Sequence, residues 1–355
     1  MLRHGREFCF TLGLSLLGAT AACANDVADF YKGKRLTIVI GYDPGGGYDL
    51  YARVIGKHIV HHIPGNPEFV PQNMPGAGSR KAANWLYELA PHDGTVIATI
   101  NNSAALDQAL GEPSVKYDAI KFNWIGNPIV DAGVTLTMAK GPYRTIEDVA
   151  TKGGMICGGT GAASPSVIYP RIINEFVGGN VKVVGGYTTT TELALAMRRD
   201  EISCIAGNTW TSLGTALAEL FTSKSMTIVL HWGQNANPAI DAYVGHHVPS
   251  IFDYVKTAGD RKVMDLLLSS AAIGRPLLAP PNVPTDRVAS LRQAFDQTMK
   301  DPDFISDVHK ANLDLDPLSG ERLQELIASF ANVSTETQAR ARDLMRPPQE
   351  YTEHR

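Results

Sequence analysis

The stretch GYDPGGGYDLYAR, residues 41–53, sets four glycines and a proline between an apolar segment and an amphipathic one. A glycine-rich turn that opens a helix usually points bare backbone amides at an anion. This loop lacks the Lys-Ser/Thr pair that completes a phosphate-binding P-loop, and its own acids, Asp43 and Asp49, would repel phosphate. The sequence of this loop therefore predicts a strand-to-helix turn that binds a ligand other than a nucleotide.

The same arrangement recurs along the chain, where an extended run ends in Gly, Ser or Thr directly before a helix. The carboxyl ends of parallel strands and the first turns of the following helices share one sheet edge, where ligands bind. Each helix start offers unpaired N–H groups and a partial positive charge, worth about 0.3–1 kcal/mol for an anion. Any single junction is equally explained as a tight turn capped by its own Ser or Thr, but four converging ones would bind a carboxylate without a lysine. The four junctions span residues 44–48, 75–79, 158–165 and 185–191.

Strand-like runs alternate with amphipathic helical runs, which predicts an α/β fold with mostly parallel sheets. Ser79 is expected to cap the second of the helices. The predicted strands cover residues 36–41, 68–71, 95–100, 134–138, 155–158, 181–184 and 202–206. The predicted helices cover 50–63, 79–89, 191–198, 286–300 and 320–344, with two more starting at Thr145 and Ser164.

Composition places the chain among ordinary globular proteins. It has 355 residues, 44% hydrophobic and 19% charged, with a formal net charge of −4, which is long enough for two domains with separate cores. The mild acidic balance gives no reason to expect nucleic acid or an anionic membrane surface as a partner.

The N-terminus has the pattern of an export signal. Basic residues precede an uncharged apolar run, 8–17, and small residues then end in Ala22-Cys23-Ala24. This pattern predicts a signal peptide over residues 1–24 and a periplasmic mature protein. Lipid anchoring at Cys23 is an alternative, disfavoured because Thr20 stands where a lipobox has leucine.

An ordered series of motifs resembles the Bug family, the extracytoplasmic solute receptors of tripartite tricarboxylate transporters. No single motif is decisive, but the series follows the family's order over nearly the whole chain after the leader. The motifs are PGGGYD (44–49), MPGAGS (74–79), DGT (93–95), NNS (101–103), GGTGAASPS (158–166), GGY (185–187), RPLLAPPNVPTDRVASL (275–291) and DPDF (301–304).

The resemblance implies a bilobed periplasmic-binding-protein fold, type II-like, with two mostly parallel α/β lobes joined by two crossover segments. Lobe 1 is expected over residues 25–127 plus 272–355 and lobe 2 over 128–271, with crossings near Asn127 and Ala271. The family's function implies a monomer without cofactor that captures a small carboxylated metabolite, often a dicarboxylate. Its partners would be the integral-membrane permease subunits of the transporter.

The family's ligand contacts carry over to both lobes. Asp49, however, lies just inside a helix N-terminus, where a structural role is favoured over ligand contact. In lobe 1 the matching positions are Tyr42, Pro44, Gly45, Gly46, Asp49, Gly76, Gly78, Ser79, Asn102 and Ser103. In lobe 2 they are Thr160, Gly161, Ser164 and Tyr187.

Two charged residues depart from the family's pattern near the expected pocket. Asp43 stands where a small residue or proline is usual, and Arg80 where a polar uncharged one is common. An unpaired Asp43 at the mouth would oppose a carboxylate. We therefore expect Asp43 either to pair with Arg80 or to face outward, unless it selects a ligand that carries an amine or hydroxyls.

Enzymatic and metal-binding alternatives find less support. The chain has no G-x-S-x-G nucleophile elbow, and Ser164 before Pro165 has the look of a helix cap. The histidines of residues 58–62 are interpreted as the solvated end of a helix rather than a metal site. An exported hydrolase or a ligand-sensing module that uses the same cleft remain the alternative functions.

Cys157 and Cys204 are the only cysteines after the leader. If lobe 2 winds as the resemblance implies, they lie near the ends of neighbouring parallel strands. An exported protein permits a disulfide between them, but two free buried thiols are equally compatible with the pattern.

Overall fold

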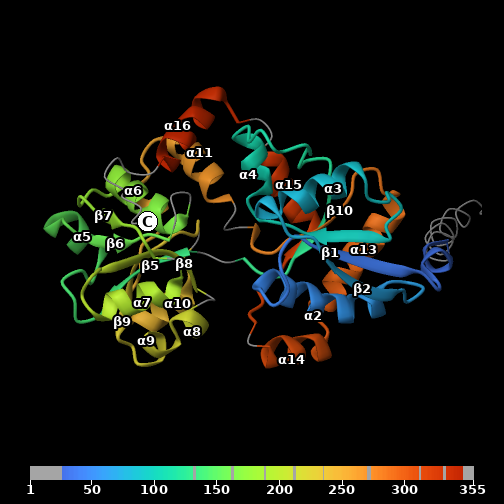
Figure 1. Cartoon of the computed structure of the whole chain (residues 1–355), viewed down its shortest axis with the longest axis horizontal. Helices are drawn as coiled ribbons and strands as arrows, with labels where there is room; N and C mark the ends of the chain where they lie inside the picture. Colours follow the sequence, from blue (N-terminus) through green and yellow to red (C-terminus); the bar gives the residue numbers. More distant parts are fainter. Residues whose placement is uncertain are drawn as a thin grey trace, which may run out of the picture.

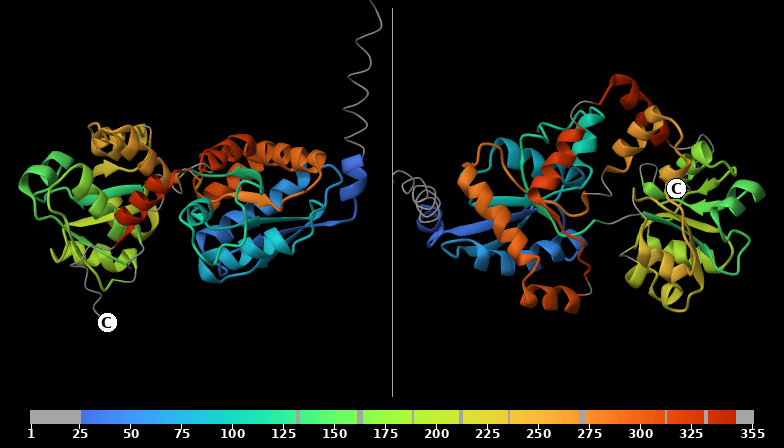
Figure 2. Two further views of the ribbon diagram at one scale, coloured as in Figure 1. Left: turned by 90° about the horizontal axis from the view of Figure 1, so that it is seen from above. Right: turned by 180° about the vertical axis from the view of Figure 1, so that it is seen from behind.

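The structure is a computed structural model that describes residues 26–130, 133–160, 164–187, 189–210, 213–234, 236–269, 273–311, 313–330 and 333–346. The predicted signal peptide (with Cys23), Gly161 and Ala271 lie outside the described residues. The chain forms two α/β bodies that lie side by side, each built around its own open sheet (Figures 1 and 2). We call them lobe 1 and lobe 2.

Lobe 1 holds a 6-stranded sheet in the order β11-β4-β10-β3-β1-β2. β1 runs parallel to β2 and β3, whereas β10 is antiparallel to β3 and β4, and β11 is antiparallel to β4. The strands are β1 (Arg35–Ile40), β2 (Glu68–Asn73), β3 (Val96–Thr99), β4 (Asn123–Asn127), β10 (Leu277–Ala279) and β11 (Leu318–Ser319).

Helices cover both faces of the lobe 1 sheet, which explains why β1 ends in the continuous buried apolar run of residues 38–40. Ile38 and Ile40 pack with residues of α2 and α13, while Val39 between them faces the helices of the other side. The helices are α2 (Gly47–His62), α3 (Arg80–Glu88), α4 (Ala104–Ala109), α13 (Thr285–Thr298), α14 (Pro302–Lys310) and α15 (Gly320–Ser329).

Lobe 2 holds a 5-stranded sheet in the order β7-β6-β8-β5-β9. β6 is parallel to β7 and β8, and β5 is antiparallel to β8 and β9. The strands are β5 (Gly133–Met138), β6 (Ile156–Gly158), β7 (Lys182–Val184), β8 (Cys204–Thr209) and β9 (Met226–His231). The helices are α5 (Ile146–Lys152), α6 (Pro165–Phe176), α7 (Thr190–Arg198), α8 (Leu213–Ala216), α9 (Ala218–Thr222), α10 (Pro238–Val244) and α11 (Ala258–Leu267).

The expectation of mostly parallel sheets is wrong, because both sheets are mixed. β5 and β10 are the first strands after the chain passes from one sheet to the other, and each enters antiparallel to both of its neighbours. The parallel βαβ units are therefore confined to the β1–β3 and β6–β8 regions, where the predicted binding loops lie.

The single helix predicted over 320–344 is also wrong. α15 ends at Ser329, and a separate helix, α16 (Thr335–Met345), begins where the Ser334 hydroxyl accepts a hydrogen bond from the Thr337 amide at 3.1 Å. α16 packs on α6 and α11 of lobe 2, where Ala341 and Leu344 are buried. The C-terminal stretch, expected with lobe 1, thus includes a helix that lies on lobe 2 (Figure 1).

Cys157 and Cys204 lie opposite each other on the parallel strands β6 and β8. The structure joins them in a disulfide that spans 47 positions of sequence. This bridge links the strand before the Thr160 loop to the strand that ends near Asn208.

Candidate functional site

The loop after β1 leaves the start of α2 open. Its N-cap residue, Gly46, has extended backbone angles and makes no side-chain capping bond. Gly45 adopts a φ of +91°, a left-handed conformation that favours glycine. The first amides of this 16-residue helix are thus the uncapped positive end that the sequence predicts.

Asp49 is turned into the protein to brace the loop. Its side chain accepts hydrogen bonds from the Gly45 amide, from Arg53 Nε and from Asn73 Nδ2, each at 2.9 Å. Burial would raise the pKa of Asp49, but these hydrogen bonds favour the charged form and hold its pKa below the ordinary value. The carboxylate is committed to the loop, which is the structural role favoured from the sequence.

Tyr48 connects three separate parts of the chain. Its ring stacks on that of Tyr42, with centroids 4.3 Å apart. Its hydroxyl accepts a hydrogen bond from the Asn102 amide at 3.1 Å and donates one to the Gly274 carbonyl at 3.2 Å. Burial raises the pKa of Tyr48, so the hydroxyl stays protonated and can donate.

The second loop closes against the third through Ser79. Ser79 has a left-handed φ of 74° and makes no capping bond to α3, so its predicted role as a cap is wrong. Its buried hydroxyl instead accepts a hydrogen bond from the Asn101 amide at 3.1 Å. A Cβ at Gly41 would lie 2.0 Å from this hydroxyl, so the close approach of the two loops requires glycine there.

Asp43 and Arg80 do not pair. Arg80 Nη1 lies 3.4 Å from Asp107 Oδ2, and Ser103 Oγ donates to the other oxygen of the same carboxylate at 3.2 Å. Asp43 is exposed to solvent. Of the arrangements expected from the sequence, the pair with Arg80 is therefore not formed.

In lobe 2, hydroxyls gather at the start of α6. Ser164 occupies the N-cap and Pro165 the first helical position, but the Ser164 hydroxyl lies 2.7 Å from that of Ser166 instead of capping the helix. The buried Ser166 hydroxyl also accepts a hydrogen bond from the Thr160 amide at 3.0 Å and lies 3.1 Å from the Thr160 hydroxyl. Ser166 is thus the centre of this cluster.

The fourth junction lies at the same edge of the lobe 2 sheet. β6, β7 and β8 run parallel, so Thr160 and Tyr187, which follow β6 and β7, lie on the same side of the sheet as Asn208 near the end of β8. The Thr190 hydroxyl lies 3.4 Å from Asn208 Oδ1. Tyr187 packs beside Gly158, where a Cβ would be 3.3 Å from its ring.

The predicted site residues thus fall into two clusters. The lobe 1 cluster joins the loops around Tyr42, Gly45, Asp49, Ser79 and Asn102, and the lobe 2 cluster joins those around Thr160, Ser164 and Tyr187. Pro44 and Gly46 are exposed on the first loop, while Gly76 and Gly78 take positive φ values in the second. β1 and β3 end on the side of lobe 1 that faces lobe 2 (Figure 1).

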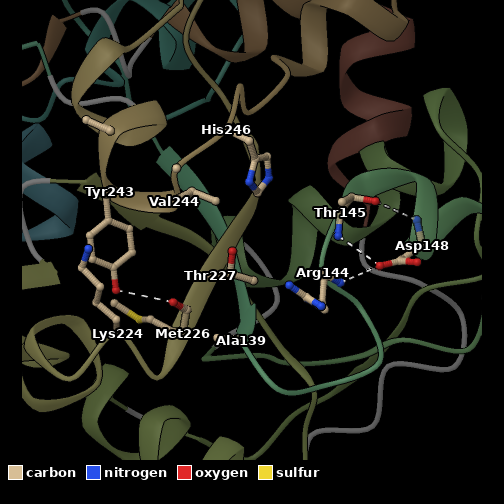
Figure 3. Close-up of a pocket in the computed structure, with 12 residues that line it drawn as sticks. Ala139, Arg144, Thr145, Asp148, Lys224, Met226, Thr227, Tyr243, Val244 and His246 are labelled. Carbon is tan, nitrogen blue, oxygen red and sulfur yellow. Dashed lines mark hydrogen bonds between the residues drawn. The ribbon is translucent and has the colours of Figure 1, made fainter.

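A cavity of about 590 Å³ lies elsewhere on lobe 2, between β9, α10 and the start of α5 (Figure 3). Arg144, Lys224 and His246 reach it, and Asp148 accepts hydrogen bonds from the Arg144 and Thr145 amides beside it. β5 runs antiparallel to β8, and Thr137 near the end of β5 pairs with Cys204, the first residue of β8. The lining residue Ala139 comes two positions after Thr137. The cavity therefore lies at the edge of the sheet opposite the one that holds the hydroxyl cluster. This cavity is separate from the predicted site.

Of the histidines of α2, His61 is exposed as expected, but His58 and His62 contact acidic side chains, contrary to the expectation. His58 is buried with Nε2 3.1 Å from Asp307 Oδ2, and His62 Nε2 is 2.9 Å from Asp301 Oδ2. Asp307 lies on α14 and Asp301 directly precedes this helix. No local sequence pattern predicts that α14 packs against α2. In the part of the chain that the structure describes, no group of three or more His, Cys, Asp or Glu side chains is arranged to hold a metal ion.

Sequence reasoning missed two side chains of the clusters. Ser166 lies in the same GGTGAASPS motif, two positions after the predicted contact Ser164. Only the structure shows that Ser166 is buried. Arg275 opens the RPLLAPP motif, and its guanidinium lies 5.2 Å from the centroid of the Tyr48 ring. A basic residue in an otherwise apolar, proline-rich run was the signal available for Arg275.

Comparison with known proteins supports the fold through structure alone. No family model matches the sequence, and no curated protein sequence matches it. Within the described ranges, no helix is both long and apolar enough to cross a membrane.

Solved structures with a similar fold include solute-binding proteins. A TctC solute-binding protein from Polaromonas, without ligand, superposes with a TM-score of 0.68 at 17% identity, covering 89% of this chain and 99% of that one. The periplasmic binding protein BugD superposes with a TM-score of 0.58 at 15% identity, covering 90% and 100%. MatC from Rhodopseudomonas palustris with bound malate gives 0.53 at 17% identity, covering 88% and 99%. This chain therefore has the fold of the TctC and BugD solute-binding proteins.

Proposed function

We propose that this protein is an extracytoplasmic solute-binding protein that captures a small carboxylated metabolite between its lobes. It would deliver the solute to the permease subunits of a tripartite tricarboxylate-type membrane transporter. The observation that carries the proposal is the pair of loop clusters, each at the strand ends of its own sheet, on the fold of TctC and BugD.

The chemistry of the two clusters suits a carboxylate. In lobe 1 the uncapped start of α2 presents backbone amides beside the stacked rings of Tyr42 and Tyr48. In lobe 2 the hydroxyls of Thr160 and Ser164 stand at the start of α6. Amides at a helix N-terminus and neutral hydroxyls bind anions well, and the malate bound to MatC gives one example of such a ligand on this fold.

We propose lobe boundaries at residues 25–127 plus 272–355 and 128–271, with α16 returning to pack on lobe 2. Capture then requires a hinge motion that brings the two clusters onto one solute, driven by contacts that only the closed form makes. The predicted ligand contacts, including Gly161, belong to this proposal.

Binding is favoured over catalysis because the solved structures named above that share this fold are solute-binding proteins. The leader sequence and the fold together support an extracytoplasmic location.

The test is native mass spectrometry of the protein purified after export, followed by thermal-shift measurements with mono-, di- and tricarboxylates. We expect an acid to raise the melting temperature while its amide analogue does not. The bound acid should be recovered chemically unchanged after long incubation. Stabilisation by uncharged solutes only, or conversion of the acid, would overturn the proposal.

A further inference from the structure

The guanidinium of Arg275 lies against the first turn of α2. Its Cζ is 5.2 Å from the centroid of the Tyr48 ring and 5.3 Å from that of Tyr51. A Cβ at Gly47 would be only 3.0 Å from Arg275 Nη2, so this glycine leaves the space that the guanidinium occupies. The cation thus lies beside the first residue of the helix.

The surroundings hold Arg275 in this position. Its backbone amide donates a hydrogen bond of 2.8 Å to Oδ1 of the fully buried Asn127, at the end of β4. The tyrosines on which it rests are fixed by their hydroxyls, Tyr48 on the Gly274 carbonyl and Tyr51 on the Asp314 carbonyl at 2.7 Å. A guanidinium placed on fixed rings loses little further freedom when it binds a partner.

The charge of Arg275 is not neutralised within the described part of the chain. No carboxylate there forms an ion pair with it, and its buried Nε has no hydrogen-bond partner. The two acids of the lobe 1 cluster are engaged elsewhere, Asp49 with Arg53 and Asp107 with Arg80. Buried polar atoms are normally hydrogen-bonded, so the partnerless Nε of this partly buried side chain points to a partner that comes from outside.

The start of α2, beside Arg275, would also be stabilised by an anion. The N-terminus of α2 carries partial positive charge and no side-chain cap, and a cation next to it is unfavourable on its own. One anion placed between them would satisfy both. A carboxylate fits best, because its two oxygens match the fork of a guanidinium and also accept from helix amides.

We propose that Arg275 binds a carboxylate of the solute, seated between the guanidinium and the first amides of α2, and selects acids over uncharged solutes. This inference rests on the proposed function, since the solute comes from the cleft. It adds a side-chain cation to a site otherwise formed by backbone amides and hydroxyls. Gly47 becomes part of the seat because a Cβ there would crowd the guanidinium.

The experiment compares Arg275→Gln and Arg275→Lys with the native chain. Arg287→Gln is the matched control, because Arg287 also lies over an aromatic ring, 3.5 Å from the centroid of Phe30, but is tied to the Asp93 carbonyl. The probes are malate and adipate with their diamides, measured by calorimetry and thermal shift on the purified chain.

We expect Arg275→Gln to weaken dicarboxylate binding by about tenfold or more, with Arg275→Lys intermediate and Arg287→Gln without effect. Without ligand, Arg275→Gln should melt at or above the native temperature, because it removes an unpaired cation from a helix N-terminus. A merely structural arginine would instead lower that temperature and leave affinity unchanged.

The contrary outcomes separate this inference from the proposed function. Native affinity of Arg275→Gln for the acids would overturn the role of Arg275 and leave the proposed function standing. An equal loss of affinity for acids and diamides would also overturn it. If the native chain bound the diamides and none of the acids, both proposals would fall.

Discussion

At the scale of single residues, Asp49 shows how a carboxylate on a binding loop serves the loop itself. We expect Asp49→Ala to lower the free energy of unfolding by about 1–3 kcal/mol, because the Gly45 amide, Arg53 and Asn73 lose one shared acceptor. Urea denaturation measures the change. Asp43→Ala on the same loop is the control, and this exposed residue should change stability by less than about 0.5 kcal/mol. Equal effects of the two variants would contradict this account of Asp49.

The exposed position of Asp43 also predicts its effect on binding. Because solvent screens the charge of the exposed Asp43, Asp43→Asn should leave the affinity for carboxylates equal or slightly tighter through the loss of a weak repulsion. Calorimetry with the best acid of the panel measures this. Abolished binding would make Asp43 a direct ligand contact and would exclude a simple organic acid as the solute.

At the scale of elements, the turn into α2 depends more on Gly45 than on the adjacent Gly46. Gly45 has a φ of +91°, whereas Gly46 has a φ of −80° that any residue adopts. We expect Gly45→Ala to destabilise the protein by about 1–2 kcal/mol and Gly46→Ala to have little effect. Neither change introduces a steric clash, since no atom lies within 4 Å of a Cβ at Gly45 and only the Asp43 carbonyl, at 3.9 Å, near one at Gly46. Equal destabilisation by both, measured in urea, would show that the backbone conformation is not the cause.

The contact between α2 and α14 predicts a dependence on pH. Hydrogen bonds from Lys57, His58 and Lys310 favour the charged form of Asp307 and hold its pKa well below the ordinary value. A carboxyl whose pKa is lower in the folded state stabilises the fold above the unfolded value, about 3.9, and this contribution is lost as pH falls through the folded pKa.

Asp307→Asn should therefore lower the melting temperature at pH 7, and its difference from the native chain should shrink below about pH 4. Melting curves between pH 7 and pH 3 measure this. Asp303→Asn, on the exposed side of the same helix, provides the comparison and should differ little from the native chain throughout. A difference for Asp307→Asn that stayed constant with pH would rule out ionisation of Asp307 as its origin.

At the scale of the whole molecule, the two lobes are linked by several passages of the chain. α16 packs on lobe 2, and its Arg342 donates hydrogen bonds of 3.0 and 2.6 Å to the Leu110 carbonyl, just after α4 of lobe 1. If ligand capture closes the lobes, a saturating carboxylate should reduce the radius of gyration in small-angle X-ray scattering. The diamide of the same acid is the matched control. An unchanged scattering profile with bound acid would argue against closure by a hinge.

Much of the secondary structure and the positions of the binding loops follow from local sequence. Apolar residues predict β1, β3 and β5 to within a few residues, because these strands are largely buried in the middle of their sheets. Glycine marks the turn into α2, because Gly45 has a positive φ that few other residues adopt. Pro165 marks the start of α6, because the first helical position tolerates proline. The break before α16 escaped prediction, since a serine cap within a helical pattern is a weak local signal.

Only the tertiary structure decided what these loops contact. Tyr48 meets Gly274 across 226 positions of sequence, and Arg275 reaches the start of α2 because β10 enters the lobe 1 sheet beside β3. The burial of His58 against α14 and the mixed direction of both sheets are likewise consequences of packing between distant elements. Local sequence specifies which backbone angles and apolar faces are available. Which charge lies next to which helix end depends on contacts between segments far apart in the chain, and single-chain periodicity carries no information about those contacts.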